Sequence, residues 1–105
     1  MKSIVMNMVA AGLLVAGGAM AADMPDLARK NECDACHAIE KKVVGPAWMD
    51  VARKYQGDAT AKARLTTKIM KGGGGVWGAM PMPGNPGLSE ADAGMLASFI
   101  LGLAK

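Results

Sequence analysis

The residues with the clearest chemistry lie together at positions 33–37, which read Cys-Asp-Ala-Cys-His. This stretch holds both cysteines and the only histidine of the chain. A Cys-x-x-Cys-His pattern is typical of a c-type haem attachment site, where each thiol forms a thioether with one vinyl group of the porphyrin. The imidazole can then serve as the proximal ligand of the iron. The pattern therefore predicts one haem c attached to Cys33 and Cys36, with His37 on its iron.

Three other kinds of site could use the same residue types. A disulfide between Cys33 and Cys36 would close a very short loop and would not need His37. A thioredoxin-like redox pair usually accompanies a βαβ pattern, and the sequence shows no convincing strand. A zinc site needs four ligands, whereas the chain offers two cysteines and one histidine. Haem attachment is favoured because it uses every Cys and His that the chain has.

The second axial position of such an iron decides between electron transfer and chemistry at the metal. No second histidine exists, so the remaining good candidates are methionines beyond residue 22: Met24, Met49, Met70, Met80, Met82 and Met95. Four of them fall in predicted helices, where methionine usually fills gaps in a core. Met82 lies between Pro81 and Pro83, which stiffen the backbone on both sides. We favour Met82 as the ligand, with Met80 as the main alternative.

Residues 1–21 predict a cleavable secretory signal. Their single charge, Lys2, precedes a mostly apolar run that ends in Ala-Met-Ala, a small-residue cleavage pattern. Cleavage at that point, or one residue later, leaves residues 22–105 as one domain. The alternative is a retained membrane anchor, because residues 3–22 carry no charge and are about long enough to span a bilayer. Glycines in the segment and the cleavage pattern favour removal, and export to the periplasm fits covalent haem attachment.

Four helices are expected. Asp23 is predicted to cap the first, which runs to about Asn31 with Pro25 in its first turn. The second is predicted to start at Pro46 and to end near Gly57. Its apolar face comprises Trp48, Val51, Ala52 and Tyr55.

The carboxy-terminal half holds the other two helices. Asp58 or Thr60 is predicted to open the third, which ends near Lys71 because a run of four glycines follows. Residues 76–88 form a long loop with three prolines, of a kind that a compact domain seldom keeps without a use. Ser89 is predicted to cap the last helix. The apolar stripe of that helix comprises Met95, Leu96, Phe99, Ile100 and Leu103.

A domain of this size buries only a small core and usually needs further stabilisation, such as disulfides or a metal. A haem would supply a large apolar slab for the helices, so the haem-free chain is predicted to be largely unfolded. Without Lys2, the 12 basic side chains fall to 11 against 9 acidic ones. Two haem propionates would roughly cancel that excess, so net charge indicates little about partners.

Four motifs follow one another with family-like spacing: residues 33–39, 44–47, 75–78 and 81–83. Through them the chain resembles the small bacterial class I cytochromes c that donate electrons to nitrite reductase or a terminal oxidase. The resemblance covers essentially all of residues 22–105. It implies an all-α cytochrome c fold, with about four helices wrapped around one covalently bound haem. It also implies a one-electron carrier and no enzymatic activity.

The resemblance also assigns roles to single residues. Met82 matches the axial methionine of the family, and Met80 matches an ordinary apolar position. Asn85 matches a residue whose amide approaches the methionine sulfur. The chain departs from the family at Gly84, where proline is usual, which leaves the shape of the loop open.

The remaining site residues follow from the same resemblance. The carbonyl of Pro46 would accept a hydrogen bond from His37, fix its ring and raise its basicity. Trp77 matches a residue whose indole N–H meets a haem propionate. Lys68 stands where an arginine does likewise.

These residues predict a periplasmic electron carrier whose iron alternates between ferrous and ferric with both ligands bound. We expect a monomer that meets redox partners briefly, among them a membrane cytochrome complex, nitrite reductase or a terminal oxidase. Neither nucleic-acid binding nor stable membrane insertion of the processed chain is expected. Lysines around the haem edge could steer an acidic partner or serve solubility alone: Lys41, Lys42, Lys68 and Lys71. The alternatives are a haem enzyme or gas sensor, which usually needs a distal acid–base residue, and a structural domain that merely retains haem.

Overall fold

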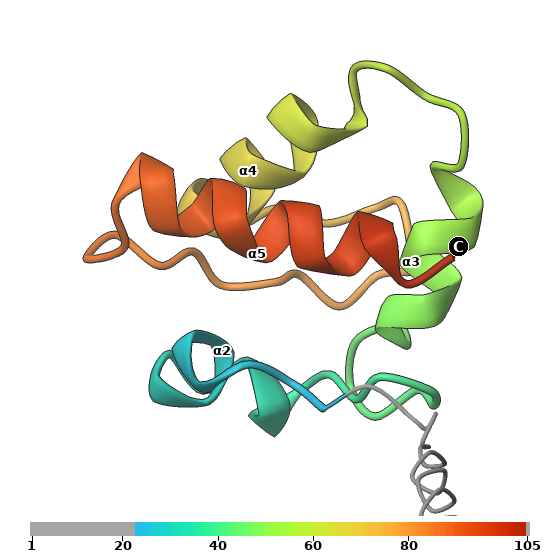
Figure 1. Cartoon of the computed structure of the whole chain (residues 1–105). Coiled ribbons are helices and arrows are strands. Elements are labelled where there is room, and N and C mark those ends of the chain that lie inside the picture. Colours follow the sequence, from blue (N-terminus) through green and yellow to red (C-terminus); the bar gives the residue numbers. More distant parts are fainter. Residues whose placement is uncertain (1–22, 105) are drawn as a thin grey trace, which may run out of the picture.

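The computed structural model describes residues 23–104 and contains four α-helices and one 3-10 helix in this part of the chain (Figure 1). The elements are α2 (Asp26–Lys30), the 3-10 helix η2 (Cys33–Ala35), α3 (Trp48–Lys54), α4 (Ala61–Lys71) and α5 (Glu90–Gly102). Over the same residues the backbone forms two isolated β-bridges and no strand. The all-α prediction is confirmed, whereas the predicted signal at residues 1–21 lies outside the described residues.

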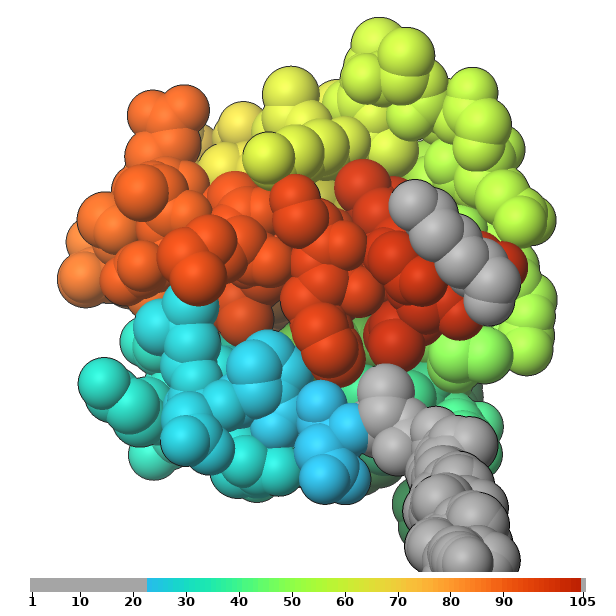
Figure 2. Space-filling model, in the orientation of Figure 1, coloured from blue at the N-terminus to red at the C-terminus, as the bar shows by residue number. Residues whose placement is uncertain are grey.

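Helix α5 contacts the other three α-helices. In Figure 2 it crosses the middle of the visible face, between the amino-terminal segment and α4. Its buried residues share one face because they recur at three- and four-residue intervals: Ala93, Leu96, Ala97 and Ile100. Ser89 caps the helix as predicted, since its hydroxyl accepts a hydrogen bond from the Asp92 amide at 3.1 Å.

The prediction that Met95 belongs to the buried apolar stripe of α5 was wrong. Met95 is 63% exposed. It follows Ala93 by two residues, which is about 200° around a helix, so it lies opposite the buried face. The other apolar residues of the predicted stripe are buried or packed against the core.

The first two helices start later than the sequence predicted. The N-cap of α2 is Pro25, whose carbonyl accepts hydrogen bonds from the next turn, and no side chain caps this helix, so the predicted Asp23 cap was wrong. Helix α3 starts at Trp48 rather than Pro46. Its first amides bind carbonyls from the preceding loop: Trp48 N donates to Ala38 at 3.0 Å and Met49 N to Ile39 at 2.9 Å. These bonds attach α3 directly to the segment that follows His37.

Helix α4 follows its prediction closely. Thr60 is the N-cap, and the Asp58 carboxylate accepts hydrogen bonds from the Thr60 amide at 2.9 Å and hydroxyl at 2.7 Å. Gly72 ends the helix with φ +78°, a left-handed conformation that glycine adopts without steric cost. No helix within residues 23–104 combines the length and hydropathy of a membrane span.

Candidate functional site

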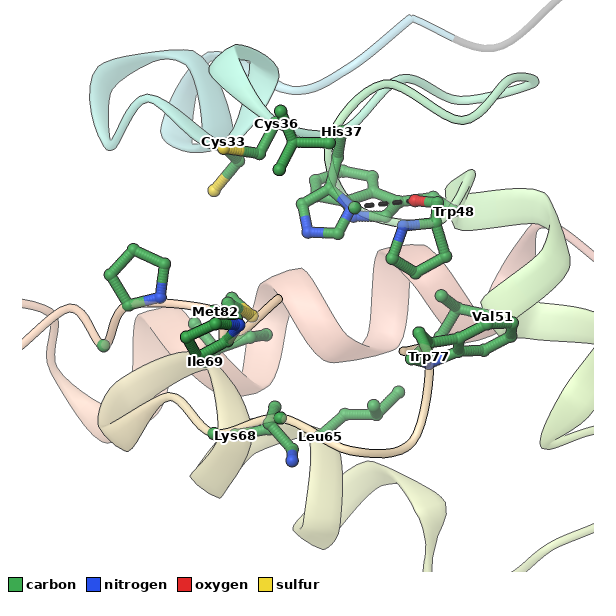
Figure 3. A pocket seen from close by; sticks show the side chains of 18 of the residues that line it. Cys33, Cys36, His37, Trp48, Val51, Leu65, Lys68, Ile69, Trp77 and Met82 are labelled. Carbon is green, nitrogen blue, oxygen red and sulfur yellow. Dashed lines mark hydrogen bonds between the residues drawn. The ribbon is translucent and has the colours of Figure 1, made fainter. Parts of the chain in front are cut away.

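The cysteines and the histidine are brought together by the short helix η2. The carbonyl of Cys33 accepts hydrogen bonds from the amides of Cys36 at 3.2 Å and His37 at 2.9 Å. As a result all three side chains border one cavity of about 440 Å³. Figure 3 shows them entering it from one side, with Met82, Leu65 and Lys68 on the other. The predicted attachment residues are therefore close together in space as well as in sequence.

No disulfide joins Cys33 to Cys36. Burial raises the pKa of the Cys33 thiol above its usual value, and the negative charge of Asp34 raises it further. A thiol with a raised pKa is protonated at neutral pH and is a weak nucleophile for disulfide exchange. This direction is opposite to the lowered pKa of a reactive redox cysteine.

The ring of His37 is oriented by Pro46, as predicted. Its Nδ1 lies 2.8 Å from the carbonyl oxygen of Pro46. A carbonyl can only accept, so Nδ1 carries the proton and donates it. The Nε2 lone pair is then available for a metal, and the bond strengthens the imidazole as a ligand. Pro46 itself lies outside α3, whose N-cap is Ala47.

Gly45 lies against the face of the same ring. A Cβ built at this position would come within 2.5 Å of His37 Cε1 and 3.0 Å of both ring nitrogens. The amide of Gly45 also donates to the Cys36 carbonyl at 2.7 Å. Gly45 is therefore needed for space, and it ties the loop before Pro46 back to the attachment motif.

We expect Gly45→Ala to displace the His37 imidazole and to break its bond to Pro46. Overpacking of this kind costs about 1–3 kcal/mol of unfolding free energy. Denaturant unfolding of the haem-bearing protein measures the loss, and NMR of the ring protons reports its orientation. Gly87→Ala is the matched control, because a Cβ there meets nothing within 4 Å and its φ is not left-handed. Equal stabilities of the two variants would contradict the role given to Gly45.

Met82 is the better held of the two loop methionines. Its amide donates to the Gly73 carbonyl at 2.7 Å, and its carbonyl accepts from the Gly73 amide at 3.0 Å. Its side chain is half-buried and packs against the core. Met80 also borders the cavity but is 69% exposed. The greater burial and the backbone bonds of Met82 favour it over Met80 as an iron ligand.

Asn85 has a different bond from the one that the resemblance implies. Its side-chain amide donates to the Ile69 carbonyl at 2.9 Å, and its backbone amide to the Met70 carbonyl at 3.0 Å. Within residues 23–104 it makes no hydrogen bond to the Met82 sulfur. The last carbonyls of a helix have no partner inside the helix, and Asn85 supplies two donors to those of α4. Asn85 thus holds the loop that carries Met82 against α4.

Gly84, where the family usually has proline, has a structural reason in this chain. A Cβ there would lie 2.7 Å from the Lys71 carbonyl carbon and 2.8 Å from the Met70 oxygen. A Cβ on Gly72 would likewise clash with the backbone carbonyl of Met82. The loop and the end of α4 approach each other through these two glycines.

Trp77 and Lys68 border the cavity, as their predicted roles require. Trp77 is 43% exposed and lies on the loop between α4 and α5. Lys68 projects from α4 toward Gly73, where a Cβ would meet its Nζ at 2.9 Å. Both can present a hydrogen-bond donor to a carboxylate in the cavity.

The rest of the cavity is mainly apolar, with the side chains of Val51, Leu65, Ile69, Leu96 and Ile100 in its wall. Its volume is within the range of about 300–1,000 Å³ that is usual for cofactor pockets. Two thiols, one imidazole and the thioethers of Met80 and Met82 border this apolar space. This set of donors fits a haem that is covalently attached and held by two axial ligands.

The sequence profile of the cytochrome c family matches residues 21–104. The chain belongs to the cytochrome c family. The cytochrome is 53% identical over 94 residues to cytochrome c-552 of Nitrosomonas europaea, which covers 90% of this chain and 89% of that relative. It is 46% identical over 96 residues to cytochrome c-551 of Pseudomonas aeruginosa, with 91% of each chain covered.

The crystal structure of wild-type Nitrosomonas europaea cytochrome c552 has the same fold, with a TM-score of 0.72 and 54% sequence identity. The superposition covers 74% of this cytochrome and 96% of that chain. The cytochrome is therefore a class I, mono-haem member of the family, with one haem c attached through Cys33 and Cys36. It is a small haem protein that carries electrons.

Proposed function

We propose that the cytochrome moves single electrons between larger redox proteins in the periplasm, after removal of residues 1–21, with His37 and Met82 as axial iron ligands. The supporting observation is that both donors border one cavity, that the His37 ring is bonded to Pro46 and that the backbone of Met82 is bonded to Gly73. When bound, the haem iron supplies a one-electron couple. Because Pro46 orients the ring of His37 and Gly73 holds the backbone of Met82, little has to move when the charge changes.

The cavity wall contributes to the same property. Apolar residues exclude water from the space around the ligands, which disfavours the more highly charged oxidised state. A thioether sulfur also favours the reduced metal. Trp77 and Lys68 are proposed to bind the propionates, because both reach the cavity with a donor group.

Exposed lysines are proposed to steer an acidic partner toward the cytochrome. Lys41, Lys42 and Lys71 are exposed, whereas Lys68 is half-buried at the cavity. The first three are free to meet carboxylates of a partner, and the encounter would weaken as salt rises. Redox encounters of this type bury little surface, which suits rapid release.

A redox titration followed by absorbance spectra tests the proposed function. We expect a single reversible one-electron transition, a weak far-red methionine-to-iron band in the oxidised protein, and no carbon monoxide binding by the native reduced protein. The periplasmic fraction should contain the processed chain with one haem. A missing band together with ready carbon monoxide binding would instead favour a gas sensor.

A further inference from the structure

Lys54, the last residue of α3, lies near two aromatic rings. Its Nζ is 5.7 Å from the ring centroid of Tyr55 and 5.8 Å from that of Trp77. Both distances are within the range of about 6 Å in which an ammonium is attracted to an aromatic face. Tyr55 directly follows α3, whereas Trp77 belongs to the loop between α4 and α5. Lys54 therefore connects the end of α3 to that loop.

The aromatic partner on the α3 side is itself held in place. The guanidinium carbon of Arg64 lies 5.2 Å from the centroid of the Tyr55 ring. Arg64 also pairs with the carboxylate of Asp58, which accepts hydrogen bonds from Thr60, the N-cap of α4. Tyr55 is thus fixed from α4, and it gives Lys54 a stable surface.

The loop on the other side is exposed and rich in glycine. Residues 73–81 are all exposed, and Gly75 and Gly78 have φ values of +93° and +128°. A backbone hydrogen bond from the Gly75 amide to the Gly78 carbonyl, at 3.1 Å, closes the turn around Trp77. A loop of this composition has many accessible conformations, so a side-chain contact to Trp77 has a measurable effect on its order.

We propose that Lys54 is a positioning residue that holds Trp77 at the rim of the haem cavity and places a positive charge beside it. The contact restricts the Trp77 loop to the conformation in which the indole borders the cavity. The ammonium also stabilises the reduced, less positive state of the site. The effect on potential rests on the proposed function, whereas the effect on the loop does not.

The loop effect is measured by amide hydrogen exchange in the haem-bearing protein. Lys54→Met removes the charge and keeps a long flexible side chain. An exposed contact of this type corresponds to about a twofold to fivefold change in an opening equilibrium, so the Gly75 amide should exchange that much faster. The Gly73 amide, bonded to Met82, should be unchanged. Lys54→Arg should restore slow exchange, because a guanidinium also stacks on aromatic faces.

Two comparisons make the test decisive. Lys62→Met removes an equal charge from the exposed surface of α4 and should leave Gly75 exchange unaffected. In a Trp77→Leu background, Lys54→Met should have no further effect. The proposal is overturned if Gly75 exchanges equally fast in the Lys54 and Lys62 variants, or if Lys54→Met accelerates all amides alike.

The reduction potential gives a second, separate readout. Lys54→Met should lower it by more than Lys62→Met does, and an equal shift would refute the electrostatic part. If the oxidised protein lacks the methionine-to-iron band while Gly75 exchange still responds to Lys54, the proposed ligand set is wrong and the positioning role stands.

Discussion

Replacing Met82 with alanine is expected to abolish the far-red band of the oxidised cytochrome and to lower its reduction potential by on the order of 100 mV. The thioether is the donor that favours the reduced iron, and its removal leaves an axial position to water or another weak donor. The reduced variant should then bind carbon monoxide readily. Absorbance spectra and a redox titration measure all three effects.

Two further variants separate loss of the ligand from loss of packing. Met82→Leu keeps a side chain of similar volume against the core, so it should be more stable than Met82→Ala but should lack the band as well. Met80→Ala changes a side chain that is 69% exposed and should leave band and potential nearly as they were. If only the Met80 variant loses the band, the ligand has been assigned to the wrong methionine.

Each of the two proposed iron ligands is positioned by contacts with a neighbouring loop that contains glycine. The ring of His37 lies against Gly45, and the backbone of Met82 pairs with Gly73. Gly45 leaves room for the imidazole and the Pro46 carbonyl orients it, whereas the hydrogen bonds to Gly73 hold the backbone of Met82. The site thus depends on short contacts between loops.

The attachment motif and the starts of α4 and α5 were predictable from the sequence because their signals are local. Residues 33–37 fold on themselves, so spacing alone brings both sulfurs and the imidazole to one cavity. Ser89 caps α5 through an amide three residues later, and Thr60 is held by Asp58 two residues earlier. Local bonds of this kind depend little on the rest of the fold.

Other features depend on contacts between distant segments and could not be predicted. The side-chain amide of Asn85 donates to the Ile69 carbonyl, 16 positions away in the sequence. The resemblance had implied that this amide approaches the sulfur of Met82. The fit of Gly45 against His37 depends on how the loop before α3 folds back, and Lys54 meets Trp77 only after α3 and the later loop pack. Glu32, with φ +61°, gave no signal at all, since glycine is the residue expected in that conformation.

A chain without haem is expected to be largely unfolded. The cavity of about 440 Å³ is bordered by core residues from three helices, among them Val51, Ile69 and Leu96. At about 24 cal/mol per Å³, an empty space of that volume would cost about 10 kcal/mol, an upper figure because its mouth is open to water. The whole stability of a small domain is only about 5–15 kcal/mol.

The Cys33→Ser/Cys36→Ser double variant, produced without haem, tests this expectation. Far-UV circular dichroism should show little helix, and urea should give no cooperative transition, whereas the haem-bearing parent should show both. The parent chain produced haem-free, with its thiols intact, is the matched control for the substitutions themselves and should be equally unfolded. A cooperative, helical haem-free chain would contradict this expectation. It would mean that α5 and its neighbours pack without the haem, and that the fold does not require the haem as part of its core.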